Sequence, residues 1–384
     1  MIYLDNAATT RIHPQVLETM MPYLTEQYGN AGSLYKFGRQ SADAVAKARK
    51  QVADLIGAEP ENIIFTSGGS EANNLVFKGL EDYLREQGKT HIITTVIEHD
   101  SVIHATEALI KRHFDVTYLP VDSQCKVSVE GVREALRGDT GLVSVMYVNN
   151  ETGAEQPIKE IAEICRENGI LFATDCVQAV GFQDVNVEEI GCDFLSMSGH
   201  KIHAPKGTGA LYVRNKDLIS SLISGGDTQE FGLRGGTENV AGIVGFGKAC
   251  EITDKYRLDN RHKINGLITA FFEKLKELSK DFEEIYPNGY CEGNTKVINL
   301  RIPGVDAETL ILRLENRMCI SAGSACRSLE LKPSRVLKAM GLSDSDAYSS
   351  IRISFSEDNY IVECQRAAIF LARACRSIRG LSNE

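Results

Sequence analysis

The chain has 384 residues, of which 43% are hydrophobic and 24% are charged, and its formal net charge is −10. This composition is sufficient for a large core or two domains, and the negative charge disfavours a nucleic-acid-binding protein. No apolar stretch reaches the roughly 18 residues that a membrane-spanning helix needs, and the N-terminus lacks a signal-peptide pattern. The ten cysteines include no Cys-x-x-Cys pair, which predicts reduced thiols in a cytoplasmic protein and no zinc site.

Residues 60–215 alternate apolar, β-rich runs with helical patterns. Several of these runs are apolar almost throughout, as expected for strands that are covered on both faces. The alternation of strands and helices predicts an α/β fold with a mostly parallel, doubly wound sheet. The predicted strands are 62–66, 91–97, 115–120, 141–148, 170–174, 193–196 and 209–213, and the predicted helices include 41–56, 71–86 and 158–168.

After about residue 250 the pattern changes to that of a smaller α+β domain. We therefore expect a large α/β domain of residues 15–250 and a small domain of residues 1–14 and 251–384. In the small domain, the sequence predicts helices at about 248–280, 307–316 and from about 359, and strands at 296–302 and 351–355.

Lys201 lies in the segment 196–207, directly after an apolar stretch. A lysine at the end of a buried strand is costly unless it has a partner or a function. One such function is a Schiff base with an aldehyde cofactor, and Asp175, which ends a second apolar strand, would keep a pyridine nitrogen of that cofactor protonated. At the ligand-binding edge of an α/β sheet, the pair predicts a site for pyridoxal 5'-phosphate (PLP). Taken singly, Asp175 would also suit a helix N-cap and Lys201 a surface loop, and His200 with His203 would suit a metal if a third ligand were near.

Two further motifs fit such a site. Residues 66–71 follow a strand and open a helix, so their N–H groups favour a phosphate, although such a turn often serves only as a helix cap. His99 closes another apolar strand. An imidazole there would stack on an aromatic cofactor and move protons, or would simply be a hydrogen-bonded histidine at a strand end.

The C-terminal part contributes a cysteine and an arginine. Small residues dominate the segment 320–328, which predicts either a mobile loop presenting Cys326 or a tightly packed turn. The neighbouring Arg327 would favour the thiolate of Cys326, which is the reactive form. Arg352 lies within an apolar strand, where its guanidinium group needs an anion, either a substrate carboxylate or a structural ion-pair partner.

Together these motifs resemble the cysteine desulfurases of the NifS/IscS type, in the class V aminotransferase branch of the fold-type I PLP enzymes. The resemblance runs from Tyr3 to about Phe355, and the short loop around Cys326 is similar to the NifS/IscS group rather than the SufS group. The segments that carry it are 3–10, 65–68, 98–99, 148–153, 198–201, 234–239 and 323–326.

The resemblance implies how the cofactor is held. Lys201 would bind PLP as a Schiff base, Asp175 would pair with the pyridinium nitrogen and Gln178 would bond the ring hydroxyl group. His99 would stack on the ring and help to move protons. The other subunit of a homodimer would contribute one group to the phosphate site, which would consist of Gly69, Ser70, Ser198, His200 and the partner subunit's Thr237.

The resemblance also implies a substrate and a product. Asn150 and Arg352 would bind L-cysteine, with Arg352 on its carboxylate. Cys326 would accept the sulfur as a persulfide, L-alanine would leave, and the sulfur would pass to an acceptor such as an iron–sulfur scaffold protein. Cys326 is also a candidate for transient binding of an iron–sulfur cluster.

Two alternative functions remain open at this point. One is another PLP enzyme of the same fold, a selenocysteine lyase or an aminotransferase, although Cys326 argues against a plain aminotransferase. The other is a non-catalytic sulfur-carrier or scaffold subunit, against which the retained Lys201, Asp175 and His99 argue.

The chain departs from the family pattern in several places. Phe231 stands where an arginine is common, Arg327 stands where a threonine is usual, and Ser70 replaces a threonine but keeps the hydroxyl group. The segment 353–358 also differs from the usual pattern. None of these changes removes a catalytic group.

Overall fold

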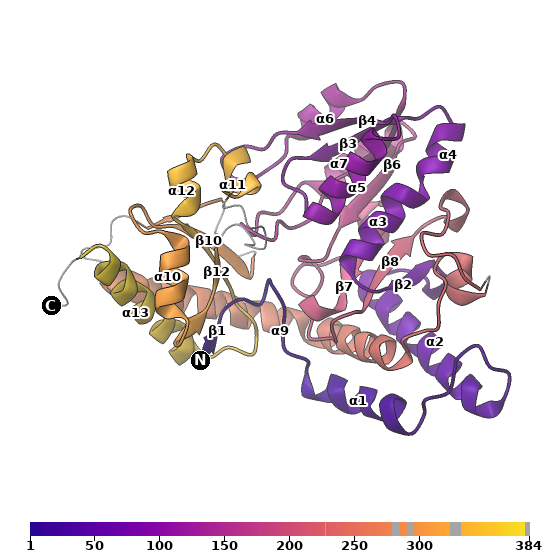
Figure 1. Cartoon of the computed structure of the whole chain (residues 1–384), viewed down its shortest axis with the longest axis horizontal. Coiled ribbons are helices and arrows are strands. Elements are labelled where there is room, and N and C mark those ends of the chain that lie inside the picture. The colour runs from indigo at the N-terminus through magenta and orange to yellow at the C-terminus, as the bar shows by residue number, and fades with distance from the viewer. Residues whose placement is uncertain (227, 279–284, 290–294, 323–331, 381–384) are drawn as a thin grey trace.

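The structure is a computed structural model that describes residues 1–226, 228–278, 285–289, 295–322 and 332–380. Figure 1 shows a large sheet flanked by helices and a smaller sheet beside it, with the long helix α9 (Val240–Leu278) running past both. The short N-terminal strand lies with the smaller sheet, far along the chain from the residues that it contacts.

The large sheet has seven strands in the order β2-β8-β7-β6-β5-β3-β4. All seven strands expected from the sequence are present, and the central ones are parallel, while β8 is antiparallel to both neighbours. The mostly parallel, doubly wound arrangement is therefore confirmed. The strands are β2 (Ile63–Thr66), β3 (His91–Thr95), β4 (Asp115–Leu119), β5 (Thr140–Ser144), β6 (Leu171–Asp175), β7 (Phe194–Ser198) and β8 (Gly209–Val213).

Two cores cover the two faces of this sheet. Because successive side chains of a strand point to opposite faces, Ile63 packs into the core beneath α2, α7 and α9, whereas Ile64 packs into the core beneath α3 and α5. This explains the continuous apolar runs of the central strands. The helices of this part are α1 (Pro14–Thr25), α2 (Lys36–Ile56), α3 (Gly69–Gly79), α4 (Glu81–Glu86), α5 (Asp100–Ile110), α6 (Val129–Ala135), α7 (Ile158–Glu167) and α8 (Val187–Ile190).

Several element boundaries differ from the expected ones. The helix expected at 71–86 is two helices that meet at Leu80, where the carbonyl oxygen of Gly79 accepts a hydrogen bond from the backbone N–H of Ser220 (2.9 Å). The strand expected at 141–148 ends at Ser144. Helix α2 begins earlier than predicted, but it ends where expected, before Gly57, whose φ is 65°.

The second body is built on a four-stranded antiparallel sheet in the order β12-β13-β10-β9, beside the two-stranded parallel sheet β1-β11. Ile2 and Leu4 pack into its core with Phe271 of α9 and Phe355. The strands are β1 (Ile2–Tyr3), β9 (Tyr286–Pro287), β10 (Val297–Arg301), β11 (Met318–Cys319), β12 (Ser321–Ala322) and β13 (Ser350–Ser354), and the helices are α10 (Ala307–Leu314), α11 (Arg335–Ala339), α12 (Asp344–Tyr348) and α13 (Ile361–Ile378).

Helix α9 belongs to both bodies. Phe246 and Cys250 near its start pack into the core of the large sheet, whereas Ile264 and Phe271 pack into the core of the small one. The expected division at residue 250 thus falls inside one continuous helix. Because such a helix restrains the two bodies, we propose that the division separates two packed cores rather than two freely moving domains.

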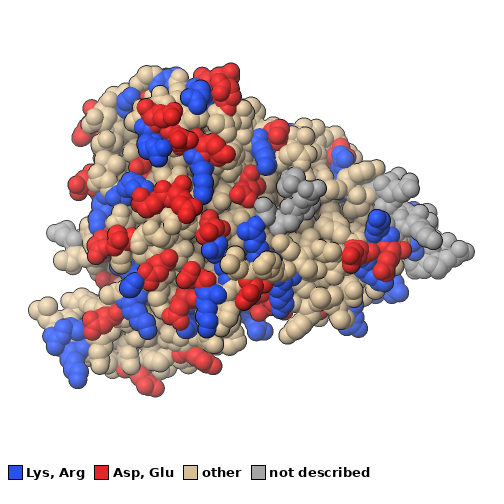
Figure 2. Space-filling model, turned by 180° about the vertical axis from the view of Figure 1, so that it is seen from behind, with Lys and Arg blue, Asp and Glu red and all other residues tan. Residues whose placement is uncertain are grey.

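The surface carries both signs of charge. Figure 2 shows basic and acidic side chains interleaved over one face of the molecule, an arrangement that does not favour nucleic-acid binding by that face. In the described part of the chain, no helix combines the length and the apolar character that crossing a membrane requires.

The contact between β8 and the loop after β2 leaves no room for a side chain at Gly209. A Cβ atom there would lie 2.6 Å from Gly68 Cα and 2.6 Å from Met197 O. We expect Gly209→Ala to lower the free energy of unfolding by about 1–3 kcal/mol. Gly266 is the matched control, because it is an exposed helical glycine at which an added Cβ atom would meet nothing within 4 Å. Gly266→Ala should raise the same free energy by about 0.5–1 kcal/mol in urea titrations.

Candidate active site

A cavity of about 430 Å³ lies at the carboxyl ends of β6 and β7, closed by the N-terminal segment and by the small sheet. This edge is where open α/β sheets bind ligands. The structure brings ten residues expected from the sequence to this cavity, and they are Gly69, Ser70, His99, Asn150, Asp175, Gln178, Ser198, His200, Lys201 and Arg352.

Lys201 follows β7 directly, at the end of a short 3-10 turn. Its Nζ donates hydrogen bonds to the carbonyl oxygens of Ala7 (2.5 Å) and Ala8 (2.9 Å). Burial, the cationic Arg352 and the cationic Lys296 together lower the pKa of the Lys201 amine to about 7. A large fraction of Lys201 is therefore the neutral, nucleophilic amine near neutral pH.

Asp175 is the last residue of β6 and is buried. Its Oδ2 accepts a hydrogen bond from Asn73 Nδ2 (2.8 Å), and its Oδ1 accepts one from the backbone N–H of Val177 (2.9 Å). These two donors fix the orientation of the carboxylate group. Sequence reasoning did not single out Asn73, although a buried asparagine on an otherwise apolar helix face, beside Ala72 and Val76, was a signal that could have been used.

In the side-chain amide group of Gln178, the nitrogen is hydrogen-bonded and the oxygen is not. Its Nε2 donates to the carbonyl oxygen of Ala7 (2.9 Å), but its Oε1 is buried and has no hydrogen-bond partner among the described residues. A buried acceptor without a donor is costly, so its position in the cavity wall suits a ligand that brings a hydroxyl group.

Helix α3 begins at the opposite end of the cavity. Gly69 is tightly enclosed, because a Cβ atom there would lie 2.6 Å from Val177 Cγ2. Ser70 is exposed beside it, and the free N–H groups of the first helical turn favour an anion.

Across the cavity, Ser198 ends β7, and burial together with the charge of Lys201 lowers the pKa of His200 to about 4. His200 is therefore a neutral hydrogen-bonding group.

His99 does not end the strand directly, since β3 stops at Thr95. It is the N-cap of α5, where its Nδ1 accepts a hydrogen bond from the backbone N–H of Ser101 (3.1 Å) and lies 2.8 Å from Ser101 Oγ. The imidazole ring itself is exposed at the cavity. The helix cap thus fixes the ring without burying it.

Glu98, to which sequence reasoning gave no role of its own, is fully buried beside His99. Its Oε1 accepts hydrogen bonds from Thr95 Oγ1 (2.7 Å) and from the backbone N–H of Met146 (3.0 Å). Burial, with a contribution from the charge of Asp175, raises the pKa of Glu98 to about 8. Glu98 is therefore mainly neutral at pH 7.

Arg352 lies in the middle of β13 and is buried. It donates to the carbonyl oxygen of Asn150 (3.0 Å), to Asp5 Oδ1 (2.9 Å) and to Ser321 Oγ (3.2 Å), while its Nε has no partner in the described part of the chain. The structural ion pair considered from the sequence is therefore present, with Asp5. The unpartnered Nε and the cavity in front of it leave room for a further anion.

Of the expected site residues that the structure describes, one is not brought to this cavity by the single chain. Thr237 is exposed and does not line it. Cys326 lies outside the described residues, as does Arg327. Phe231 is described, and its ring lies under the cations of Arg49 (5.2 Å) and Lys216 (4.1 Å).

The donor set of the cavity fits PLP. It combines an amine of lowered pKa, a buried acid, an unsatisfied buried acceptor and a helix N-terminus, and these match an aldehyde, a pyridinium nitrogen, a ring hydroxyl group and a phosphate. No group of three or more His, Cys, Asp or Glu side chains that could hold a metal ion occurs among the described residues. The fold and the site together define a fold-type I PLP enzyme.

Comparison with known proteins defines the family. Residues 2–366 match the model of the class V aminotransferases, and the chain belongs to this family, whose members depend on PLP. It is 44% identical over 367 residues to a protein named cysteine desulfurase IscS from Clostridium botulinum, covering 93% of this chain and 90% of the relative.

Two solved structures support the same assignment. A NifS-like protein superimposes with a TM-score of 0.90 at 33% identity, covering 99% of this chain and all (100%) of the other. A second structure, described as SspA in complex with cysteine, superimposes with a TM-score of 0.80 at 34% identity, covering 94% of this chain and 100% of the other.

Proposed function

We propose that this protein is a PLP-dependent cysteine desulfurase, which converts L-cysteine to L-alanine and takes the sulfur onto Cys326 as a persulfide. The single observation that carries the proposal is that Lys201, Asp175 and Arg352 line one cavity. A PLP-binding lysine, a ring-nitrogen acid and a carboxylate-binding arginine are what an α-amino acid reaction needs. The names of the similar proteins are the reason for proposing cysteine, rather than another amino acid, as the substrate.

The cofactor would be held by the residues named from the sequence. Lys201 would bind its aldehyde, Asp175 its ring nitrogen and Gln178 its hydroxyl group, with His99 on the ring. When bound, PLP supplies an electron-accepting ring that stabilises negative charge at the substrate Cα. The phosphate would lie against the start of α3, on Gly69, Ser70, Ser198 and His200.

The substrate would be held by Asn150 and Arg352. The guanidinium group of Arg352 already pairs with Asp5, so a substrate carboxylate would join or replace this carboxylate. Asn73 and Val177 hold the Asp175 carboxylate group in place, where it would pair with the ring nitrogen. The exposed His99 would move protons at the substrate face.

The sulfur would pass to Cys326. Its thiolate would attack the substrate sulfur, the bond between that sulfur and the substrate Cβ would break, and the carbon skeleton would take up a proton and leave as L-alanine. L-cysteine and a thiol thus become L-alanine and a persulfide, and no external oxidant or reductant is consumed. The persulfide would then be given to an acceptor, for which we propose an iron–sulfur scaffold protein in the cytoplasm.

We further propose that the active unit is a homodimer. Thr237 is exposed and would reach the phosphate of the partner subunit's site. Helix α1 supports this proposal, because it exposes large apolar side chains on one face, at Leu17, Met21 and Leu24. Size-exclusion chromatography with light scattering would measure the oligomeric state, and a monomer that is fully active would contradict the role of Thr237.

The direct test is turnover of L-cysteine by the yellow, PLP-loaded protein with a thiol reductant. Equimolar alanine and sulfide are expected. PLP absorbance without alanine from L-cysteine, but with alanine from L-selenocysteine, would identify a selenocysteine lyase instead. A colourless protein that does not take up PLP would support a non-catalytic sulfur-carrier subunit.

The lowered pKa of Lys201 predicts how PLP uptake depends on pH. Only the neutral amine attacks an aldehyde, and the neutral form increases as the pH rises through the pKa of about 7. We therefore expect the rate of PLP uptake by the apoprotein to rise with pH, with a midpoint near 7 rather than near the ordinary lysine value of about 10.4. Stopped-flow absorbance between pH 5.5 and about 9 would measure this midpoint.

A further inference from the structure

A second lysine, Lys296, is buried beside Lys201. It lies just before β10 and is only 8% exposed. Within the described part of the chain its side chain forms no ion pair, and its Nζ donates one hydrogen bond, to the carbonyl oxygen of Lys201 (3.3 Å). Burying an ammonium group without an ion-pair partner is costly, so the position calls for a function.

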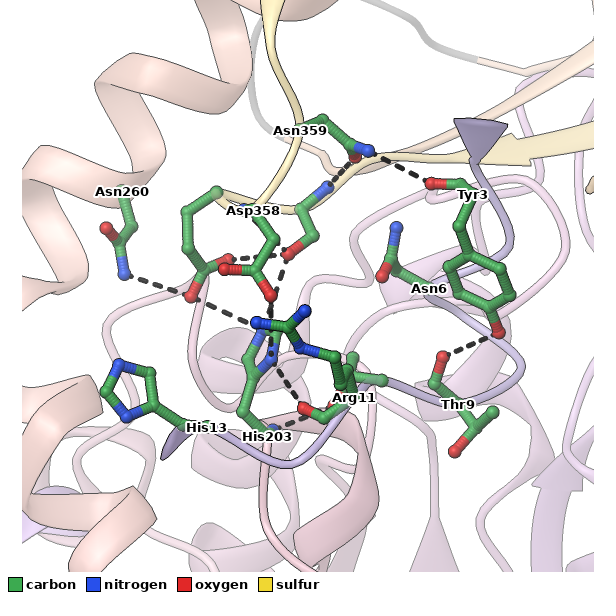
Figure 3. Close-up of polar contacts among 12 residues, drawn as sticks. Tyr3, Asn6, Thr9, Arg11, His13, His203, Asn260, Asp358 and Asn359 are labelled. Carbon is green, nitrogen blue, oxygen red and sulfur yellow. Dashed lines mark hydrogen bonds and ion pairs between the residues drawn. The ribbon is translucent and has the colours of Figure 1, made fainter. Parts of the chain in front are cut away.

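His203 also holds the segment around Lys201, through hydrogen bonds to the N-terminal part of the chain. The backbone of His203 is in the left-handed region, with a φ of 65°, which is uncommon for a residue other than glycine. Its N–H donates to Thr10 Oγ1 (2.8 Å), its carbonyl oxygen accepts from the N–H of His13 (3.0 Å), and its Nδ1 donates to the carbonyl oxygen of Arg11 (2.9 Å). Figure 3 shows His203 enclosed between Arg11, His13 and the loop that carries Asp358.

The carboxylate group of Glu357, in the loop after β13, faces Lys296 and His203. Its Oε1 accepts from Asn260 Nδ2 of α9 (3.1 Å) and lies 3.4 Å from His203 Nε2. Burial opposes the charge on Glu357, but the hydrogen bond and the charge of His203 outweigh it and lower the pKa of Glu357 to about 2. Glu357 and Lys296 both line a small pocket that Lys201 also lines, and neither of them lines the active-site cavity.

We propose that Lys296 is a positioning residue for Lys201, which holds the Lys201 carbonyl group and, as a second buried cation, favours the uncharged form of the Lys201 amine. Burial lowers the pKa of Lys296, and the negative charge of Glu357 opposes this lowering and so favours the cationic form of Lys296. The inference rests on the proposed function, since a neutral amine at Lys201 matters only if Lys201 binds an aldehyde. The electrostatic part acts through space and needs no contact with PLP or substrate.

The charges around the Lys201 amine come from every element packed against it. Arg352 of β13 and Lys296 oppose its protonation, whereas Asp5 of the N-terminal segment and Asp175 of β6 favour it. Arg352 is expected to bind substrate and Asp175 to bind the cofactor. Lys296 does not line the active-site cavity and contacts the backbone of Lys201, so it can be changed without removing a ligand-binding group.

The test is the pH dependence of the Lys201 amine in the full-length protein after removal of PLP. The acetylation rate of Lys201 by acetic anhydride, followed by peptide mass spectrometry, reports the fraction of neutral amine without any need for activity. Lys296→Met should move the midpoint of this rate upward by roughly half to one pH unit. Lys296→Gln removes the charge but keeps a hydrogen-bond donor, and it should also move the midpoint upward.

The controls separate the electrostatic role from a structural one. Lys50→Met removes an exposed lysine of α2 that pairs with Asp54, and it should leave the midpoint unchanged. A lower melting temperature for Lys296→Met with an unchanged midpoint would show a purely structural role and overturn the proposal. If Lys296→Met does not fold, Lys296→Gln decides the matter, and a midpoint that stays or falls contradicts the proposal.

The same samples distinguish a failure of the proposed function from a failure of the proposed role of Lys296. PLP absorbance of the wild-type protein tests whether Lys201 binds an aldehyde at all. If the wild type takes up PLP while neither variant shifts the midpoint, the proposed function stands and the role of Lys296 fails. If the midpoints shift as expected but no PLP is taken up, the proposed function fails.

Discussion

Lys201→Ala is expected to lose desulfurase activity by about 10³-fold or more and to lose the visible absorbance of bound PLP. The reason is that the site has no other described lysine lining the cavity that could replace the amine. Alanine and sulfide release from L-cysteine and the absorbance spectrum of the purified variant would measure both effects.

Lys159→Ala is the matched control for this variant, because Lys159 is an exposed lysine that pairs with Glu189. It should keep both the activity and the colour. Retention of a covalent PLP adduct in Lys201→Ala, detected by borohydride reduction and mass spectrometry, would mean that another lysine binds the cofactor and that Lys201 has been assigned wrongly.

Cys326→Ala is expected to abolish persulfide formation and sulfide release, by about 10³-fold or more, while PLP stays bound. Of the cysteines that the structure describes, every one except Cys319 is buried. Burial raises the pKa of thiols such as Cys125 and Cys165 to about 12, so these groups remain protonated and unreactive near neutral pH. No buried thiol can therefore replace Cys326.

Cys319→Ala provides the comparison, since Cys319 is the partly exposed cysteine in the described part of the chain. We expect it to retain turnover and a persulfide on Cys326. Alkylation of the persulfide followed by mass spectrometry would locate the sulfur. Full turnover by Cys326→Ala, or a persulfide found on Cys319, would transfer the role to the other thiol.

The parts of the fold that were predicted from the sequence are those that local patterns encode. Several of the seven strands of the large sheet are short apolar runs, because both of their faces are covered, whereas the edge strand β4 is only partly buried. Boundaries were less well predicted where tertiary contacts decide them. The helix expected at 71–86 divides at Leu80, where the carbonyl oxygen of Gly79 accepts a hydrogen bond from Ser220, and no helical propensity reports that contact.

The residues of the site also divide into those that local sequence patterns reveal and those that tertiary contacts decide. Lys201 and Asp175 were recognisable because a charged residue at the end of an apolar strand is costly to bury unless it has a partner or a function. Asn73 and Asp5 were not recognised, because their importance depends on which distant residue they meet. Asp5 pairs with Arg352, which lies 347 positions away in the chain.

By itself, the sequence determined the chemistry available to this protein: an amine and an acid at strand ends, a glycine-rich helix start and a cysteine among small residues. These follow from residue types and their spacing, which need no knowledge of the fold. Only the tertiary structure decided the state of those groups. The Lys201 amine has a pKa of about 7 because burial, Arg352 and Lys296 act on it together, and electrostatic effects of this kind depend on distance in space rather than along the chain.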